Sequence, residues 1–472
     1  MSLEPTAGLA FCMRRMKRAA LLLLALGACC GGAQTAEARK LNVILILADD
    51  FGYECVTANG GQSYSTPNLD RLAAGGVRFS RCHVQPLCTP TRVVLMTGMS
   101  NVRNYTQFGA MERSQTTFAH IMKQAGYATC IAGKWQLGRD LGLPKHFGFD
   151  EHCLWQLNRR PGRYKNPGLE INGKQKNYTN GKYGPDIVND YALDFIARKK
   201  AGPFFLYYPM MLTHAPFEPT PESADYAGFG SKGGEKGNRK YFADMVAYMD
   251  KLIGKLVAHL DELGLRDNTL ILFLGDNGTG AGVVSTCNGK QVSGGKGQTS
   301  ERDTHVPAIA NGPGNVVVSQ VCDDLIDASD FLPSFCEMAG VTLPVTLKLD
   351  GRSFAPQLRG EPGTPRPWLY SWYQPRGPSG RKAEFARDKR FKLYSTGEFF
   401  DVTKDPDERS PLRELGDDAK LARAKLQAAI ESFKGARPEA IARQAGESGD
   451  TEEESERKPK GKGPLRKEAA KS

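Results

Sequence analysis

The sequence of 472 residues contains no continuous apolar run of about 18 residues, which excludes a membrane-spanning helix. It also lacks the G-x-S-x-G, H-E-x-x-H and complete G-x-x-x-x-G-K-[ST] strings of serine esterases, zinc proteases and P-loop nucleotidases. No basic helix or aromatic-interleaved basic stripe is present, so no nucleic-acid partner is expected. The eleven cysteines form no C-x-x-C pattern and no even framework, which argues against a zinc ribbon or a disulfide scaffold.

What is present is ordinary for a globular protein, with 40% hydrophobic and 24% charged residues and a formal net charge of +11. The N-terminus differs from the rest, because a basic patch at 14–18 precedes a short apolar run at 19–28. Small residues follow, and 36–38 reads Ala-Glu-Ala, so we expect a signal peptide over 1–38 and export to the periplasm or the medium. An alternative is lipoprotein processing, with lipidation of Cys29.

The C-terminal end has a different character again. Six acids lie between 447 and 456, and seven bases with one acid lie between 457 and 472. Almost no apolar residues accompany them, so burial cannot offset the entropy cost of ordering this segment. We expect a disordered, solvated tail over 437–472, without a function of its own.

Between these ends, continuous apolar runs of strand length alternate with helical patterns. The runs lie at 41–48, 128–132, 204–208 and 269–274, and the clearest helical spacing lies at 240–263. Strands that are apolar on both faces suit a sheet covered by helices on both sides. We therefore predict an α/β domain over 41–344 with a large, mainly parallel or mixed sheet sandwiched by helices.

After residue 345 the pattern changes to short strands joined by tight turns. We predict strands at 385–387, 391–394 and 399–402 and a helix over 418–433. This is typical of a small C-terminal antiparallel sheet plus one helix, over 345–436.

Oxygen-bearing side chains follow two of the predicted strands. Asp49 and Asp50 end the first strand, and Asp276 and Asn277 follow the run at 269–274. Ligands of α/β sheets gather at such strand ends, and carboxylate and amide oxygens suit Ca²⁺ or Mg²⁺. Each pair alone has a simpler reading, as a polar strand stop or an Asn-Gly turn. Together they predict one metal site built from both halves of the domain.

The most informative string is Cys88-Thr-Pro-Thr-Arg92, followed by Thr97-Gly98. Pro90 suits the first turn of a helix, which would leave Cys88 at the positive helix end, where sulfate or phosphate is attracted. The alternative reading is a cysteine that is simply buried or bridged.

This string resembles the type I sulfatase signature C-x-P-x-R-x-x-x-x-T-G. The resemblance extends over nearly the whole body of the chain, through the strings at 49–50, 66–72, 133–135, 213–216, 275–278, 294–297 and 349–353. It implies an alkaline-phosphatase-like α/β fold and a sulfatase whose Cys88 is oxidised to formylglycine (3-oxoalanine). A formylglycine-generating system is then implied as a maturation partner.

The resemblance also implies a role for each matching residue. Asp49, Asp50, Asp276, Asn277 and position 88 would bind Ca²⁺, with Mg²⁺ less favoured. Arg92 and Lys134 would hold the formylglycine hydroxyls, Lys296 would contact sulfate oxygens, and His214 would protonate the leaving oxygen. Lys290 is an alternative to Lys296 for the sulfate contact.

Two positions depart from the family pattern. Relatives commonly carry Gly-Lys-Trp-His-Leu-Gly, whereas this chain has Gln136 in place of the histidine, and an amide cannot take up a proton near neutral pH. Relatives also often show Gly-Gly-x-Arg before Val-Pro, whereas this chain carries Asp303 and His305 there. We hypothesise that His305 or Asp303 reshapes the pocket and replaces the missing base.

The sequence therefore predicts hydrolysis of an organic sulfate monoester, either a sulfated small molecule or a polysaccharide. A phosphoester or phosphonate hydrolase on the same scaffold is an alternative, because phosphate and sulfate share tetrahedral geometry. A sulfated-glycan-binding relative without turnover is another. Loops such as 155–184 and 218–238, rich in Gly, Lys, Arg and Tyr, are expected to set the substrate.

Overall fold

A computed structural model describes residues 40–230, 237–375 and 382–444. The predicted signal peptide over 1–38 and the alternative lipidation site Cys29 lie outside the described residues. Within the described ranges, none of the helices combines the length and apolar character needed to cross a membrane.

The four apolar runs form the centre of one large sheet. Strands β8 (Thr269–Gly275), β1 (Asn42–Ala48), β7 (Phe204–Pro209) and β3 (Ala128–Lys134) lie side by side in this order, and all are parallel. Every residue of β1 is buried, as expected for a strand covered on both faces. The prediction of these four strands is confirmed.

The outer strands make the sheet mixed. They are β2 (Gly76–His83), β4 (Glu151–Trp155), β5 (Gly168–Ile171), β6 (Lys174–Asn177), β11 (His305–Asn311), β12 (Gln320–Cys322) and β13 (Ile326–Asp327). Strand β11 runs antiparallel to β8 and to β2, and β5 runs antiparallel to β4. A separate hairpin joins β9 (Val284–Cys287) to β10 (Lys290–Ser293).

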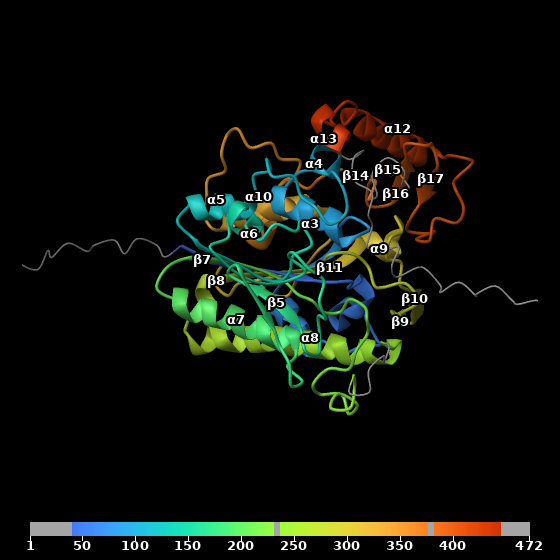
Figure 1. Ribbon diagram of the computed structural model, residues 1–472. Coiled ribbons are helices and arrows are strands. Elements are labelled where there is room, and N and C mark those ends of the chain that lie inside the picture. Colours follow the sequence, from blue (N-terminus) through green and yellow to red (C-terminus); the bar gives the residue numbers. More distant parts are fainter. Residues whose placement is uncertain (1–39, 231–236, 376–381, 445–472) are drawn as a thin grey trace, which may run out of the picture. The chain divides into compact units, whose positions relative to one another are not determined.

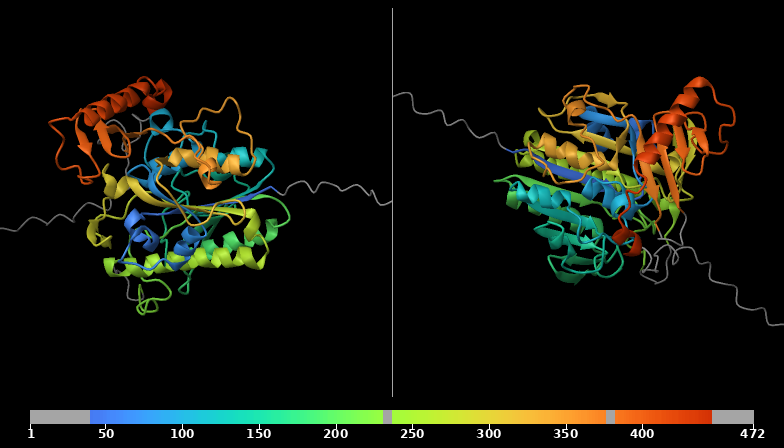
Figure 2. Two further views of the ribbon diagram at one scale, coloured as in Figure 1. Left: turned by 180° about the vertical axis from the view of Figure 1, so that it is seen from behind. Right: turned by 90° about the horizontal axis from the view of Figure 1, so that it is seen from above.

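Helices cover both faces of the sheet (Figures 1 and 2). One face packs against α3 (Cys88–Thr97), α5 (Phe118–Gln124), α6 (Leu143–His146) and α10 (Phe331–Met338). The other packs against α2 (Pro67–Ala74), α7 (Gly184–Lys199) and α8 (Phe242–Glu262). Shorter helices are α4 (Asn101–Asn104), α9 (Glu301–Thr304) and α11 (Ala355–Leu358).

Strand β1 shows how the two cores arise. Val43, Leu45 and Leu47 enter one core, whereas Ile44 and Ile46 enter the other, because successive side chains point to opposite faces. The predicted helix at 240–263 is confirmed as α8, whose apolar side chains belong to the second core. The sandwiched α/β architecture is therefore as the sequence predicted.

The C-terminal part forms a four-stranded antiparallel sheet. Its strands are β14 (Leu369–Tyr373), β15 (Ala383–Arg387), β16 (Phe391–Tyr394) and β17 (Phe399–Asp401). Helix α12 (Asp417–Ser432) packs on it through a small core that includes Leu426 and Leu393. The predicted small sheet and helix are confirmed, and β14 is an additional strand.

Two boundaries differ from the expected ones. Helix α13 (Glu439–Gln444) lies inside the range 437–472 expected to be disordered, and Ile441 is buried. That part of the expectation is wrong, because 439–444 are helical and one apolar side chain there is buried; the remainder lies outside the described residues. The boundary at 345 stays a prediction, since Phe354 and Leu358 still belong to the large core.

Candidate active site

The two oxygen-rich strand ends meet at one edge of the sheet. Strands β1 and β8 pair in parallel with Ala48 opposite Gly275, so the residues that follow them are neighbours. The backbone N–H of Asp50 donates to Asp276 Oδ1 over 3.0 Å. Asn277 Nδ2 donates to Asp50 Oδ1 over 2.8 Å. Four groups from two distant stretches of the chain therefore form one buried cluster.

Cys88 joins this cluster from the N-terminus of α3. The thiol sulfur and one carboxylate oxygen each of Asp49 and Asp276 lie within 4.8 Å of one another, and all three side chains are buried. Pro90 lies in the first turn of α3, as predicted. The eight cysteines of the described residues are all free, so Cys88 is not bridged to any of them.

Two buried cations face the carboxylates. Lys134, at the end of β3, donates from Nζ to both oxygens of Asp49 over 2.9 and 3.0 Å. Arg92, one turn along α3 from Cys88, donates from Nη2 to Asp276 Oδ2 over 3.0 Å. These contacts compensate buried charge that would otherwise be costly.

Burial nevertheless opposes the ionisation of two of the three carboxylates. Burial raises the pKa of Asp276 to about 7 and also raises the pKa of Asp50, and Asp49 adds to both shifts. Burial acts on Asp49 in the same way, but Lys134 and neighbouring cations outweigh it and hold its pKa well below the usual range. A divalent cation would supply the positive charge that the full set of carboxylates requires.

The donor atoms fit such a cation. Asn277 Oδ1 is buried and accepts no hydrogen bond in the structure, although a buried amide oxygen normally does. Together with the oxygens of Asp49, Asp50 and Asp276 it offers only hard ligands, which suit Ca²⁺ or Mg²⁺ better than a softer metal. The predicted metal ligands therefore lie together and fit the expected group.

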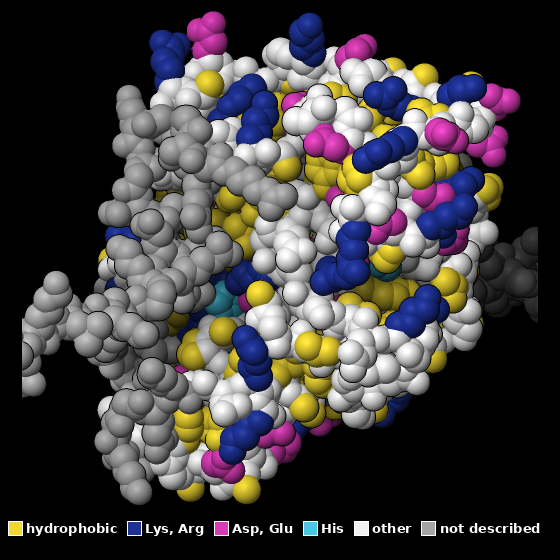
Figure 3. Space-filling view, turned by 90° about the vertical axis from the view of Figure 1, so that its right-hand side faces the viewer, with side chains coloured by type: hydrophobic (Ala, Val, Ile, Leu, Met, Phe, Trp, Pro, Cys, Tyr) yellow, Lys and Arg dark blue, Asp and Glu magenta, His cyan; other side chains and the backbone are white. Residues whose placement is uncertain are grey.

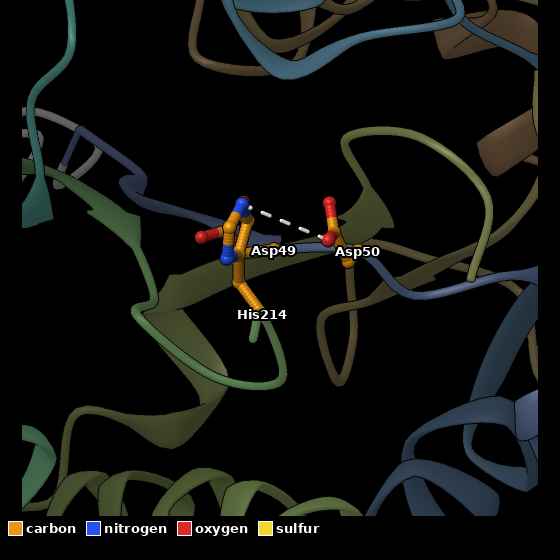
Figure 4. A group of neighbouring side chains, drawn as sticks. All are labelled: Asp49, Asp50 and His214. Carbon is orange, nitrogen blue, oxygen red and sulfur yellow. Dashed lines mark ion pairs between the residues drawn. The ribbon is translucent and has the colours of Figure 1, made fainter. Parts of the chain in front are cut away.

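Lys296 and His214 form the second half of the cluster. Lys296 Nζ lies 2.9 Å from Asp50 Oδ2 and 2.8 Å from His214 Nε2. His214, in the loop after β7, places Nε2 3.7 Å from Asp50 Oδ2, and Figure 4 shows its ring beside the strand end that carries Asp49 and Asp50. Burial lowers the pKa of His214 well below its ordinary value, and Lys296 lowers it further. The alternative, Lys290, is exposed on β10.

Lys296 and Lys134 differ in how far they are buried. In the space-filling view a histidine and basic side chains lie together in a hollow (Figure 3). Lys296 is the more accessible member of the cluster, with 16% of its side chain exposed, whereas Lys134 is fully buried. A substrate that reaches the cluster therefore meets Lys296 before it meets Lys134.

The two departures from the sequence pattern have different outcomes. Gln136 lies against the nucleophile position, because Cys88 Sγ donates to Gln136 Oε1 over 2.8 Å. His305 instead bonds through Nε2 with Ser80 O over 2.9 Å and stacks on Tyr53 at 4.1 Å. His305 is therefore held against β2, and the hypothesis that His305 or Asp303 replaces the missing base stays a prediction.

Sequence reasoning did not identify one residue of the cluster. Arg163 Nη1 lies 3.4 Å from Asp49 Oδ2, and its guanidinium lies 4.0 Å from the centre of the Trp155 ring. It comes from the loop after β4, far from Asp49 in sequence and outside any recognisable string. Only the basic character of the loop 155–184 pointed toward it.

Comparison with known protein families gives a match for most of the chain. Residues 41–341 match the model described as Sulfatase, and residues 296–434 match the model described as N-sulphoglucosamine sulphohydrolase, C-terminal. The chain therefore belongs to the sulfatase family, and it is a sulfuric ester hydrolase.

Individual sulfatases are also similar to this chain in sequence and in structure. Human (Homo sapiens) arylsulfatase A is 32% identical over 426 residues, which cover 82% of this chain and 80% of that protein. Mouse (Mus musculus) N-acetylgalactosamine-6-sulfatase is 32% identical over 388 residues, covering 74% of this chain and 71% of that protein. A solved structure described as Ps i-CgsB in complex with k-i-k-neocarrahexaose has a TM-score of 0.70 at 26% identity, covering 85% of this chain and 94% of that chain.

Proposed function

We propose that this enzyme hydrolyses sulfate monoesters of a carbohydrate or an aryl alcohol, with a formylglycine made from Cys88 as nucleophile and Ca²⁺ as cofactor. One observation carries the proposal: a free, buried Cys88 at a helix N-terminus shares its surroundings with Asp49 and Asp276. A thiol is a poor ligand for a hard cation, so its position among carboxylates is best explained if another functional group replaces it.

The absent groups would supply two kinds of chemistry. Hydrated formylglycine at position 88 would offer one hydroxyl to attack sulfur and a second whose proton loss expels sulfate. Ca²⁺ held by Asp49, Asp50, Asp276 and Asn277 would polarise the sulfate ester. Everything else depends on side chains that the chain itself provides.

Those side chains bind the sulfate and move one proton. Lys296 carries a fixed positive charge at the accessible side of the cluster, where it would bind sulfate oxygens and stabilise charge that develops there. Nε2 of His214 accepts a hydrogen bond from Lys296 in the structure, so it would first take up a proton, and burial makes such a proton weakly held and readily given to the leaving oxygen. Lys134, Arg92 and Gln136 would orient the nucleophile at position 88.

The substrate class and location are further parts of the proposal. The neocarrahexaose complex of the structural relative and the name of N-acetylgalactosamine-6-sulfatase support a sulfated saccharide as substrate. Export rests on the basic and apolar pattern of residues 14–28, and maturation requires a formylglycine-generating system in the same cell.

Two measurements test the proposal. Mass spectrometry of the peptide spanning Cys88 should find an aldehyde in place of the thiol, in protein made in cells with a formylglycine-generating system. Turnover of 4-nitrophenyl sulfate should exceed that of 4-nitrophenyl phosphate and should be lost on chelation. Faster phosphate hydrolysis would favour a phosphoester hydrolase, whereas tight sulfated-glycan binding with an intact thiol and no turnover would favour a non-catalytic relative.

A further inference from the structure

Asn277 and Lys296 lie in two separate loops, and a third element joins them. Asn277 is in the turn after β8, and Lys296 is in the loop between β10 and α9. Asp303, on α9, is fully buried and faces both loops. Its side chain is unusual at this position, because the sulfatase pattern Gly-Gly-x-Arg places a glycine there.

Asp303 accepts a backbone hydrogen bond from each loop. Its Oδ1 accepts from Gly278 N over 2.9 Å, and its Oδ2 accepts from Gly297 N over 2.8 Å. Gly278 directly follows Asn277, and Gly297 directly follows Lys296. A buried carboxylate with both oxygens bonded to backbone N–H groups is a rigid connection, because moving either loop leaves an oxygen unsatisfied.

The backbone of both loops is adapted to this contact. A Cβ at Gly278 would lie 2.5 Å from Asp303 Cα, so only glycine lets α9 approach this turn so closely. Gly297 has a φ of +85°, in the left-handed region that favours glycine.

The two side chains that these loops carry meet at Asp50. Asn277 Nδ2 donates to Asp50 Oδ1, which leaves Asn277 Oδ1 available to a cation, and Lys296 Nζ donates to Asp50 Oδ2. The distance between the Asn277 amide and the Lys296 ammonium therefore depends on how the two loops are spaced. Apart from Asp303, Lys296 N also donates to Thr279 O, over a longer 3.3 Å.

We propose that Asp303 is a positioning residue that sets the spacing between Asn277 and Lys296 and so supports both metal binding and sulfate binding. The part of this proposal that concerns sulfate binding rests on the proposed function. The part that concerns metal binding rests only on the position and contacts of Asn277.

The variant Asp303→Asn tests this positioning role and leaves the backbone N–H groups of both loops hydrogen-bonded. Gly278 N also donates to Asp303 O over 2.7 Å, and Gly297 N also donates to Pro86 O over 3.1 Å, so both N–H groups keep an acceptor. The new amide NH₂ would face one of these N–H groups and displace its loop. Changes to such supporting residues weaken metal binding or activity about 10- to 100-fold. We expect the midpoint of a Ca²⁺ titration, followed by thermal unfolding, and the KM for 4-nitrophenyl sulfate each to rise about tenfold.

A matched control is available in α8. Asp250 is also buried, and it accepts from Asn68 N and Leu69 N over 2.9 Å each, so it joins α8 to α2 rather than to either of the two loops. Asp250→Asn should lower the unfolding temperature and leave the Ca²⁺ midpoint and KM unchanged. Saturating Ca²⁺ should restore metal occupancy in Asp303→Asn without restoring KM, because Lys296 remains displaced.

The outcomes separate the two proposals. Unchanged Ca²⁺ midpoint and KM in Asp303→Asn, or equal changes in Asp250→Asn, would overturn the positioning role. Should Asp303→Asn fail to fold, Asp303→Ala removes both oxygens without introducing a repelling group and is read in the same way. Absence of sulfate-ester turnover in the wild type would reject the proposed function, whereas the Ca²⁺ titration would still decide the role of Asp303 toward Asn277.

Discussion

Lys296 Nζ lies 2.8 Å from Nε2 of His214. An ammonium can only donate, so Nε2 accepts, and the ring proton sits on Nδ1, which lies 2.5 Å from Ala215 O. The tautomer of His214 is thus set by a cation on one side and a carbonyl on the other. Nε2, the nitrogen that faces the cluster, therefore carries no proton in the structure and must take one up before it can protonate a leaving oxygen.

The first prediction concerns this ring. His214→Ala should slow hydrolysis of an alkyl or sugar sulfate about 10²- to 10⁴-fold, because the alkoxide that leaves needs a proton. The rate of 4-nitrophenyl sulfate hydrolysis should fall much less, since nitrophenolate leaves without taking up a proton. The ratio of kcat/KM for the two substrates is the measurement, and an equal loss on both would show that His214 has a different role.

The second prediction concerns the cation. Chelation should lower the unfolding temperature of the wild type, because a cation present at 100 times its Kd stabilises the folded state by about 2.7 kcal/mol. Ca²⁺ should restore it more effectively than Mg²⁺. Asn277→Leu removes the unpaired amide oxygen. In differential scanning calorimetry, the unfolding temperature of this variant should change less on chelation or addition of Ca²⁺ than that of the wild type. A response of wild-type size in that variant would exclude Asn277 as a ligand.

The third prediction concerns Gln136, which accepts from Cys88 Sγ. Gln136→Leu removes the acceptor and should lower kcat more than it changes KM, because the contact orients the nucleophile rather than the substrate. Gln136→His should retain activity and add an ionisation near the ordinary histidine pKa of about 6.5 to the pH profile of kcat. A profile identical to that of the wild type would mean that position 136 takes no part in proton transfer.

The fourth prediction compares two arginines. Arg92 is fully buried between Asp276 and the Lys134 carbonyl. Arg92→Met should lower the free energy of unfolding by about 3–5 kcal/mol, because it leaves a buried carboxylate uncompensated. Arg198 pairs with Glu151 at the surface, with 41% of its side chain exposed, so Arg198→Met should cost no more than about 1 kcal/mol. Urea unfolding of both variants checks this, and similar costs would contradict it.

The fifth prediction concerns acid stability away from the cluster. Burial lowers the pKa of His83 well below its ordinary value, and Arg387, whose Nη1 lies 3.3 Å from His83 Nδ1, and the stacked His305 lower it further. The unfolded chain then binds the extra proton first, so stability is full above pH 6.5 and falls as the pH drops, by about 1.4 kcal/mol per pH unit for each such proton.

His83→Asn keeps a short polar acceptor near Arg387 and removes the ionisation. Its unfolding free energy should therefore fall less steeply between pH 6.5 and 5 than that of the wild type, as measured by urea unfolding at each pH. Parallel curves for the two proteins would assign the acid sensitivity to other groups.

Much of the fold could be predicted because its signals are local. The buried strands are continuous apolar runs, and α8 shows helical spacing over 21 residues. The antiparallel placement of β11 between β8 and β2 left no such signal, since pairing direction depends on contacts between distant strands. Strand β14 was missed for a similar reason, because its place in the small sheet depends on pairing with β15, which follows it along the chain.

For the site, the sequence by itself determined which chemical groups are present. Cys88 begins a helix because Pro90 suits its first turn, and the acidic residues end strands because apolar runs stop there. Tertiary structure alone decided which groups meet. Arg163 reaches Asp49, Asp303 joins two loops, and His305 bonds with Ser80, since each contact depends on strand register and loop path rather than on nearby residues.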